Sequence, residues 1–159
     1  MPDSLADGRT RVSYVPAISN IASPTTTELN AGLLLNSILT PDGLVGFEPT
    51  TADVDTSALD STYDTVDNGR ITFSGTMLRF KKQTGTDTVF TTLVRDVTGY
   101  VVIRRDVASA TAYSSSQAVE VYPIKCGDRR RLGPEKNSVA KYEVPTKVWQ
   151  APNLYAAVA

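Results

Sequence analysis

Residues 70–82, RITFSGTMLRFKK, contain the clearest β-strand pattern of the chain. Ile71 and Phe73 alternate with polar residues, which is typical of a strand that packs one face on a core. After Gly75 the apolar positions change parity, because Leu78 lies an odd number of positions from Phe73. A shift of one residue sends side chains to the opposite face of a sheet. The pattern therefore predicts a strand with a bulge or sharp bend near Gly75.

The rest of the chain also favours β structure, since it is rich in Thr, Val, Ser and Tyr. Residues 100–103, YVVI, are apolar at every position, which indicates a central strand covered on both faces. Pro41-Asp42-Gly43 has the composition of a turn that ends a strand, and Pro123 predicts an edge position or a bulge. Further strands are expected at 12–18, 33–39, 118–126 and 137–149, with 44–48 pairing to 33–39 as a hairpin.

Two segments have helical signals. Thr25 and Glu28 have the spacing of a capping box, which predicts a brief helical turn that ends at Gly32. The main helix is expected over 86–96, with Thr86 as its N-cap, packed on the outer side of the sheet. Its apolar stripe at helical spacing comprises Val89, Phe90, Leu93, Val94 and Val97.

These elements predict a mainly β fold, a β-sandwich or barrel-like domain with one flanking α-helix and a long acidic loop. The length of 159 residues predicts one domain, with flexible termini at about 1–11 and 150–159. The tail is mildly apolar and is expected to dock or fray. The residues expected in the structural core are Phe73, Val89, Phe90, Leu93, Val102 and Tyr142.

Composition excludes several classes of function. The chain has no histidine, the commonest general base and metal ligand, so neither an enzyme, a cofactor nor a metal is expected. Cys126 is the only cysteine, which rules out an internal disulfide and favours a small buried residue. The N-terminus is polar and is not expected to be a signal peptide, and no apolar run is long enough to span a membrane.

Charge is divided unevenly along the chain. Residues 1–70 hold ten Asp/Glu and three Lys/Arg, a net charge of −7, whereas residues 71–159 hold seven and thirteen, a net charge of +6. A nearly neutral chain with an acidic front and a basic back has two complementary surfaces. Such a division suits a protein that binds copies of itself, because matched charges set specificity and register.

Residues 50–68 are predicted to be a long loop, because neither a period of 2 nor one of 3.6 holds there. The segment resembles a calcium loop only superficially, since Ala58 stands where glycine is required and Asp64 where a bidentate glutamate is required. The loop is expected to be flexible in the monomer and to contact another subunit. The residues expected in that contact are Asp53, Asp55, Asp60, Asp64 and Asp67.

The turn at 127–135 is basic. Its Arg129, Arg130 and Arg131 suit phosphate or an acidic partner surface. No aromatic residue interleaves with them, which weakens a nucleic-acid interpretation. We therefore expect the three arginines to contact the aspartates of a neighbouring subunit.

Four stretches, in this order, resemble the tail tube (major tail) proteins of long-tailed bacteriophages, especially those of actinobacterial hosts. One is Ile18 through PTTTELNAG at 24–32, and another is the Asp/Thr-rich segment 50–68 leading into GRITF at 69–73. The others are 87–93 with TGYVVI at 98–103, and EVYPIK at 120–125 leading to a closing strand.

The resemblance implies a structural subunit of the virion tail, assembled in the host cytoplasm. It implies hexameric rings, joined by their inner strands into one barrel and stacked into a tube. The implied partners are further copies of the chain, a tape-measure protein, and tail tip or terminator proteins. Genomic DNA would pass through the lumen without specific binding, and no membrane is involved.

Two other functions are compatible with the sequence. The main alternative is a non-polymerising β-sandwich module that binds or decorates a virion. A more distant one is a single-stranded nucleic-acid binder that uses the basic half of the chain.

Overall fold

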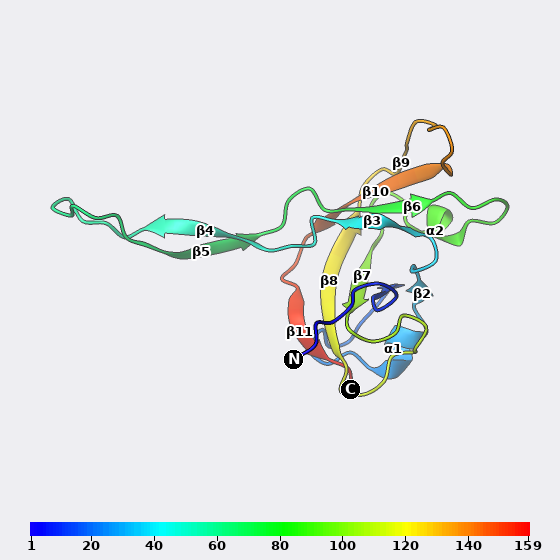
Figure 1. Cartoon of the computed structure of the whole chain (residues 1–159), viewed down its shortest axis with the longest axis horizontal. Helices are drawn as coiled ribbons and strands as arrows, with labels where there is room; N and C mark the ends of the chain where they lie inside the picture. Colours follow the sequence, from blue (N-terminus) through cyan, green and yellow to red (C-terminus); the bar gives the residue numbers. More distant parts are fainter.

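The computed structural model describes residues 1–159 as a body made of one curled antiparallel sheet, with a two-stranded arm projecting from it (Figure 1). This sheet curls into a half-barrel. Its strands, in spatial order, are β2 (Leu33–Leu34), β1 (Arg11–Val15), β7 (Thr98–Arg104), β8 (Ala118–Cys126), β10 (Lys141–Val148), β6 (Met77–Lys81) and β3 (Leu39–Val45). In addition, β11 (Asn153–Ala157) pairs with β8, and β9 (Arg130–Arg131) pairs with β10. The mainly β, barrel-like fold predicted from the sequence is confirmed.

Buried side chains pack against both faces of the sheet. An inner cluster of 15 buried residues joins Val12 of β1 to Phe80 of β6. Because those strands lie towards opposite ends of the sheet, this cluster fills its concave side. An outer cluster of nine buried residues covers the other face over β1, β7, β8 and β11, and does not extend over β6 and β10. Val101 belongs to the inner cluster and Val102 to the outer one, so the predicted central strand at 100–103 is confirmed.

The first helix, α1 (Thr26–Asn30), begins with the predicted capping box. The Thr25 hydroxyl accepts a hydrogen bond from the Glu28 N–H at 3.2 Å, and the Glu28 carboxylate accepts one from the Thr25 N–H at 3.0 Å. Two of the N–H groups that a helix start leaves unpaired are thereby satisfied.

The second helix, α2 (Thr88–Thr92), is much shorter than the predicted 86–96, and its N-cap is Asp87 rather than Thr86. It ends because Leu93 leaves the helical region, with φ −85° and ψ 73°. Val89 and Leu93 belong to the inner cluster, so the prediction that this helix covers the outer side of the sheet is wrong. A helix this short is not stable on its own, so packing against the rest of the protein must stabilise it.

The segment 33–45 differs from the predicted hairpin. Pro41-Asp42-Gly43 does not end a strand but lies within β3. Leu39 is opposite Phe80 and Leu44 is opposite Leu78, so β3 bulges between them. A bulge absorbs extra residues in one strand without ending the pairing.

The bend predicted near Gly75 is present, with a φ of +65° at that residue, but it separates two structures. β6 lies in the body, whereas residues 70–72 end β5 (Val66–Thr72) in the arm. The arm's other strand is β4 (Thr50–Asp55), so the predicted loop at 50–68 is confined to residues 56–65. The arm lacks a buried face, and the alternation that marks a half-buried strand is therefore missing from residues 50–68.

Pro123 lies within a central strand rather than at an edge. On one side β8 pairs with β7 from Glu120 to Lys125, but on the other side it pairs first with β11 and then, from Ile124, with β10. Pro123 sits where β8 changes partner, a place that tolerates a residue without an N–H. The C-terminal tail contributes β11 to this arrangement. Neither helix has the length and apolar composition needed to cross a membrane.

Candidate assembly surfaces

The arm, residues 50–72, is the most exposed part of the molecule. None of its residues is buried, and β4 and β5 pair only with each other. Its large apolar side chains are exposed to solvent: Val54, Leu59, Tyr63, Val66 and Ile71. An isolated two-stranded hairpin is marginally stable in water, and free strand edges are places where another chain can pair.

The tip of the arm, residues 56–65, is held by its own hydrogen bonds. The Thr56 N–H donates to the Thr65 carbonyl at 2.9 Å, and the two threonine hydroxyls are 2.8 Å apart. The Ser57 hydroxyl accepts from the Thr65 N–H at 3.0 Å. These bonds use the polar groups of the tip and leave Leu59 and Tyr63 pointing into solvent.

The division of charge seen in the sequence lies, in the structure, between arm and body. The arm holds five aspartates and Arg70, a net charge of −4, so the rest of the chain carries +3. Asp53 and Asp55 lie on β4 and Asp67 on β5, whereas Asp60 and Asp64 lie in the tip. The structure gathers no three side chains of the kind that hold a metal ion.

The three arginines of the basic turn have different environments. The Arg129 guanidinium stacks over the Phe90 ring at 3.9 Å, and Arg130 Nε donates to Glu143 at 2.9 Å. Arg131 is exposed on β9. The arm projects away from the body while β9 lies at the top of the body beside β10 (Figure 1), and the arginines do not pair with the arm's aspartates within one subunit.

Arg130 belongs to a row of four charged residues that crosses the sheet. Arg79 of β6 lies directly opposite Glu143 of β10, which also lies opposite Arg130 of β9. Arg79 also contacts Asp42 of β3. We call these residues the ion row. It carries no net charge and lies on the face opposite the inner cluster, because the alternate residues Phe80 and Tyr142 point into that cluster.

Asp87 links α2 to the sheet. Its carboxylate accepts hydrogen bonds from the N–H groups of Gln83 and Phe90, both at 3.0 Å, and contacts the Lys82 ammonium at 3.2 Å. The Tyr142 hydroxyl lies 3.5 Å away. Burial raises the pKa of Asp87, but these donors outweigh it and hold the pKa below its ordinary value.

The residues expected in the core divide into two groups. Val89, Leu93, Val102 and Tyr142 are buried, and Phe73 and Phe90 are half-buried against the inner cluster. Cys126 is also buried there, and burial raises the pKa of its thiol to about 11.

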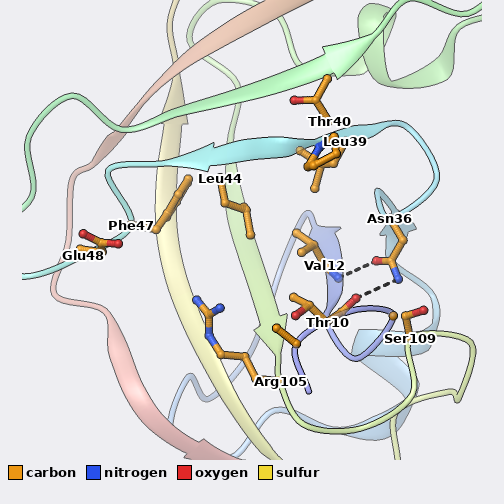
Figure 2. A pocket seen from close by; sticks show the side chains of 13 residues that line it. Thr10, Val12, Asn36, Leu39, Thr40, Leu44, Phe47, Glu48, Arg105 and Ser109 are labelled. Atoms are coloured by element: carbon orange, nitrogen blue, oxygen red, sulfur yellow. Dashed lines mark hydrogen bonds between the residues drawn. The ribbon is translucent and has the colours of Figure 1, made fainter. Parts of the chain in front are cut away.

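A pocket of about 520 Å³ lies between the N-terminal segment and β3 (Figure 2). Asn36 holds one wall, because its side chain accepts from the Val12 N–H at 2.7 Å and donates to the Thr10 carbonyl at 3.3 Å. The charged residues of the lining are Glu48 and Arg105, and Arg105 is paired with Glu120, which lies outside the pocket. Asn36 thus fastens the N-terminal segment to the body.

A buried arginine, which the sequence analysis did not single out, organises the loop after β7. Arg104 is fully buried and donates to the carbonyls of Ala108, Thr111 and Ala112 and to the Gln117 side chain, at 2.8–3.0 Å. Its partners are mostly backbone oxygens, which have no sequence signature. The one available signal was a charged residue directly following the apolar run of a central strand.

The chain's sequence matches the family described as "Phage tail tube protein" over residues 1–159. The protein belongs to the phage tail tube protein family. This is a family of structural tail components, and the exposed arm, the charge division and the half-barrel are therefore features of a tail tube subunit. No curated protein sequence matches the chain.

Two solved structures have the fold of this tail tube protein. One comes from the 6-fold symmetrised baseplate of the anti-feeding prophage, with 12% identity, a TM-score of 0.61, and 98% of each chain covered. The other comes from the sheath/tube terminator of an extracellular contractile injection system, PVC, in the extended state. It has 11% identity and a TM-score of 0.63, and the match covers 96% of this chain and 97% of that one.

Proposed function

We propose that this tail tube protein self-assembles into hexameric rings that stack head to tail, forming the conduit through which phage DNA is ejected. Membership of the family supports the tube role. The ring of six is supported by the resemblance in sequence to major tail proteins, and by the fold shared with a component of a 6-fold symmetrised baseplate.

The observation that carries the proposal is the exposed acidic arm. It has a charge of −4, no buried residue, and no partner in its own subunit, while the body carries +3. A contact between unlike surfaces of identical subunits is heterologous, and such contacts generate closed rings or open filaments. The arm therefore suits a stacking contact with the body of a neighbouring copy.

Ring formation is supported by open strand edges, among them those of β3 and β9. β3 ends the sheet order, and β9 pairs only with β10. Pairing of one subunit's edge with that of the next removes unpaired backbone groups and joins the sheets. Six half-barrel sheets joined in this way make a continuous wall.

The ion row suits a wall that DNA slides past. Its two arginines are neutralised by Asp42 and Glu143, so the ion row adds no net positive charge to the outward face of β6 and β10, which also carries Lys81, Lys141 and Lys147. Free cations lining a conduit would bind phosphate and resist passage, so the pairing of these two arginines eases passage. We place this polar face at the lumen because the opposite face of the same strands packs into the inner cluster.

The wider assembly follows from the same role. A tape-measure protein fills the lumen before ejection, tail tip and terminator proteins close the two ends, and the tail is assembled in the cytoplasm of the host. The actinobacterial host remains a prediction from the sequence resemblance.

The test is negative-stain microscopy with sedimentation of the concentrated full-length protein, alone and with its partner tail proteins. Rings or tubes of sixfold symmetry are expected. A strictly monomeric protein under both conditions contradicts the proposal and favours the non-polymerising virion module.

A further inference from the structure

An apolar groove lies at the base of the arm. It has a volume of about 800 Å³ and is formed by the end of β5 together with the segment that joins β10 to β11. Its lining includes Ile71, Phe73, Trp149, Leu154 and Tyr155, and none of its eleven lining residues is charged. Tyr155 is 93% exposed and Trp149 is 52% exposed, so this apolar surface faces solvent in the monomer. Exposed apolar surface of this kind marks an interaction site.

The tip of the arm presents the matching chemistry. Leu59 is fully exposed and Tyr63 is 80% exposed, while the backbone around them is fixed by the bonds between Thr56 and Thr65. A tip that presents two exposed apolar side chains is suited to an apolar groove, because docking removes their apolar surface from water. Asp60 and Asp64 beside them remain accessible to water at the rim.

The length of the arm matches the diameter of the body, which allows the tip of one copy to reach the groove of another. From Thr50 to Asp60 the arm runs eleven residues, which span about 35 Å in an extended strand. The 136 residues outside the arm make a body with a radius of gyration of about 14 Å, or roughly 37 Å across as a sphere. The arm of one copy is therefore long enough to cross the whole body of the next copy. Its tip then reaches the base of the next copy's arm.

The path of the arm is also complementary in charge. The arm has a net charge of −4 and the rest of the chain +3, so the arm of the next copy meets a body of opposite net charge. The flanks of the arm carry Asp53, Asp55 and Asp67. Opposite charges along the arm set the register, and the apolar tip makes the contact at its end.

We propose that residues 58–64 of one subunit dock into the groove at the arm base of the next subunit along the tube, with Leu59 and Tyr63 against Trp149 and Tyr155. This inference rests on the proposed function. It makes each arm base both the origin of one stacking contact and the receptor of another.

Cysteine cross-linking tests the contact. In a Cys126→Ala background, which removes the chain's only cysteine, Leu59→Cys and Trp149→Cys are introduced separately. The two proteins are mixed, assembled into tubes and oxidised. Heterodimers on a non-reducing gel are expected from the mixture, and monomers from tubes of either variant alone. The matched control pairs Leu59→Cys with Val139→Cys, which is exposed near β9 and lies outside the groove, and no heterodimer is expected.

Trp149 gives a second readout without any cysteine, because it is the only tryptophan. Its emission is expected to shift to shorter wavelength when wild-type tubes form. Leu59→Ser with Tyr63→Ser is expected to lose that shift, either in tubes that still form or because stacking stops at rings.

The outcomes separate this inference from the proposed function. Tubes that form with Trp149 still exposed overturn the docking contact alone. So do tubes in which Trp149 is buried without a cross-link to position 59, since a neighbour within the ring then covers the groove. Failure to form rings or tubes even with partner tail proteins overturns the proposed function and this inference with it.

Discussion

Glu143 lies directly opposite Arg79, and one of its carboxylate oxygens accepts two hydrogen bonds from that guanidinium, at 3.0 and 2.8 Å. Its other oxygen accepts from Arg130 at 2.9 Å. Burial raises the pKa of Glu143, but the bonds from the two arginines outweigh it and hold the pKa below its ordinary value. One carboxylate thus ties β6 and β9 to β10 on the face that we place at the lumen.

Glu143→Gln should lower the free energy of unfolding by about 1.5–3 kcal/mol, since it weakens charged hydrogen bonds of a buried group. Urea denaturation of the monomer measures this. Glu135→Gln is the matched control, because Glu135 is exposed and makes a single long contact, 3.8 Å, with the Lys141 ammonium. Equal stability of both variants and wild type would show that the ion row does not stabilise the fold.

Stability should fall as the pH is lowered through about 4. The pKa values of Asp87 and Glu143 are depressed in the folded state, so their ionised forms stabilise it above the ordinary pKa of about 4. This contribution is lost as the pH drops towards the folded-state values. Asp87→Asn keeps a capping side chain but removes one charge, and should make the decline shallower. Urea midpoints between pH 3 and 7 measure it, and an unchanged slope in the variant would exclude a role for Asp87.

Leu93→Ala should destabilise the monomer by about 2–5 kcal/mol, because Leu93 is fully buried in the inner cluster. Leu59→Ala, the same change in the exposed tip, should stay within about 0.5 kcal/mol of wild type. Thermal melts of both variants check the difference. A wild-type melt for Leu93→Ala would mean that α2 does not belong to the core.

The arm should be cleaved by protease in the monomer and protected in the tube. Its residues are exposed and its two strands pair only with each other, so only a neighbour can order it further. Limited proteolysis of both states, with mass spectrometry of the fragments, locates the cut within 50–68. Equal protection in both states would contradict this.

Arg131→Ser should reduce tube assembly at low salt. Arg129 and Arg130 already contact Phe90 and Glu143 of their own subunit, so changing all three arginines would mix folding with assembly. Arg131 alone isolates the contact between subunits. The deficit should shrink as salt rises and screens the ion pairs. Sedimentation across a salt series measures it, and a salt-independent deficit would point to a non-electrostatic role.

Local signals in the sequence were sufficient where burial and capping decide the structure. The apolar run at 100–103 predicted a central strand, and Thr25 with Glu28 predicted the start of α1. Gly75 was correctly expected at a bend, because a change of parity requires one.

Sequence patterns failed to predict the structure where neither the burial of side chains nor their local hydrogen bonding leaves a distinctive pattern. The arm reads as a loop because both faces of its strands are exposed. Thr86 was preferred to Asp87 as the N-cap, since both residue types cap helices and only the bond from the Phe90 N–H to the Asp87 side chain separates them. The role of Arg104 depends on carbonyl groups, and the groove at the arm base joins residues some 80 positions apart in sequence.

The isolation of the arm from its own body has a consequence for how such proteins diverge. Substitutions in residues 50–72 are not constrained by folding of the body. They are constrained only by the surface of the neighbouring copy that the arm contacts. An arm exchanged between two relatives should therefore leave each body intact while changing which subunits copolymerise. Compatibility between subunits then becomes a trait that can be inherited, or engineered, separately from the fold.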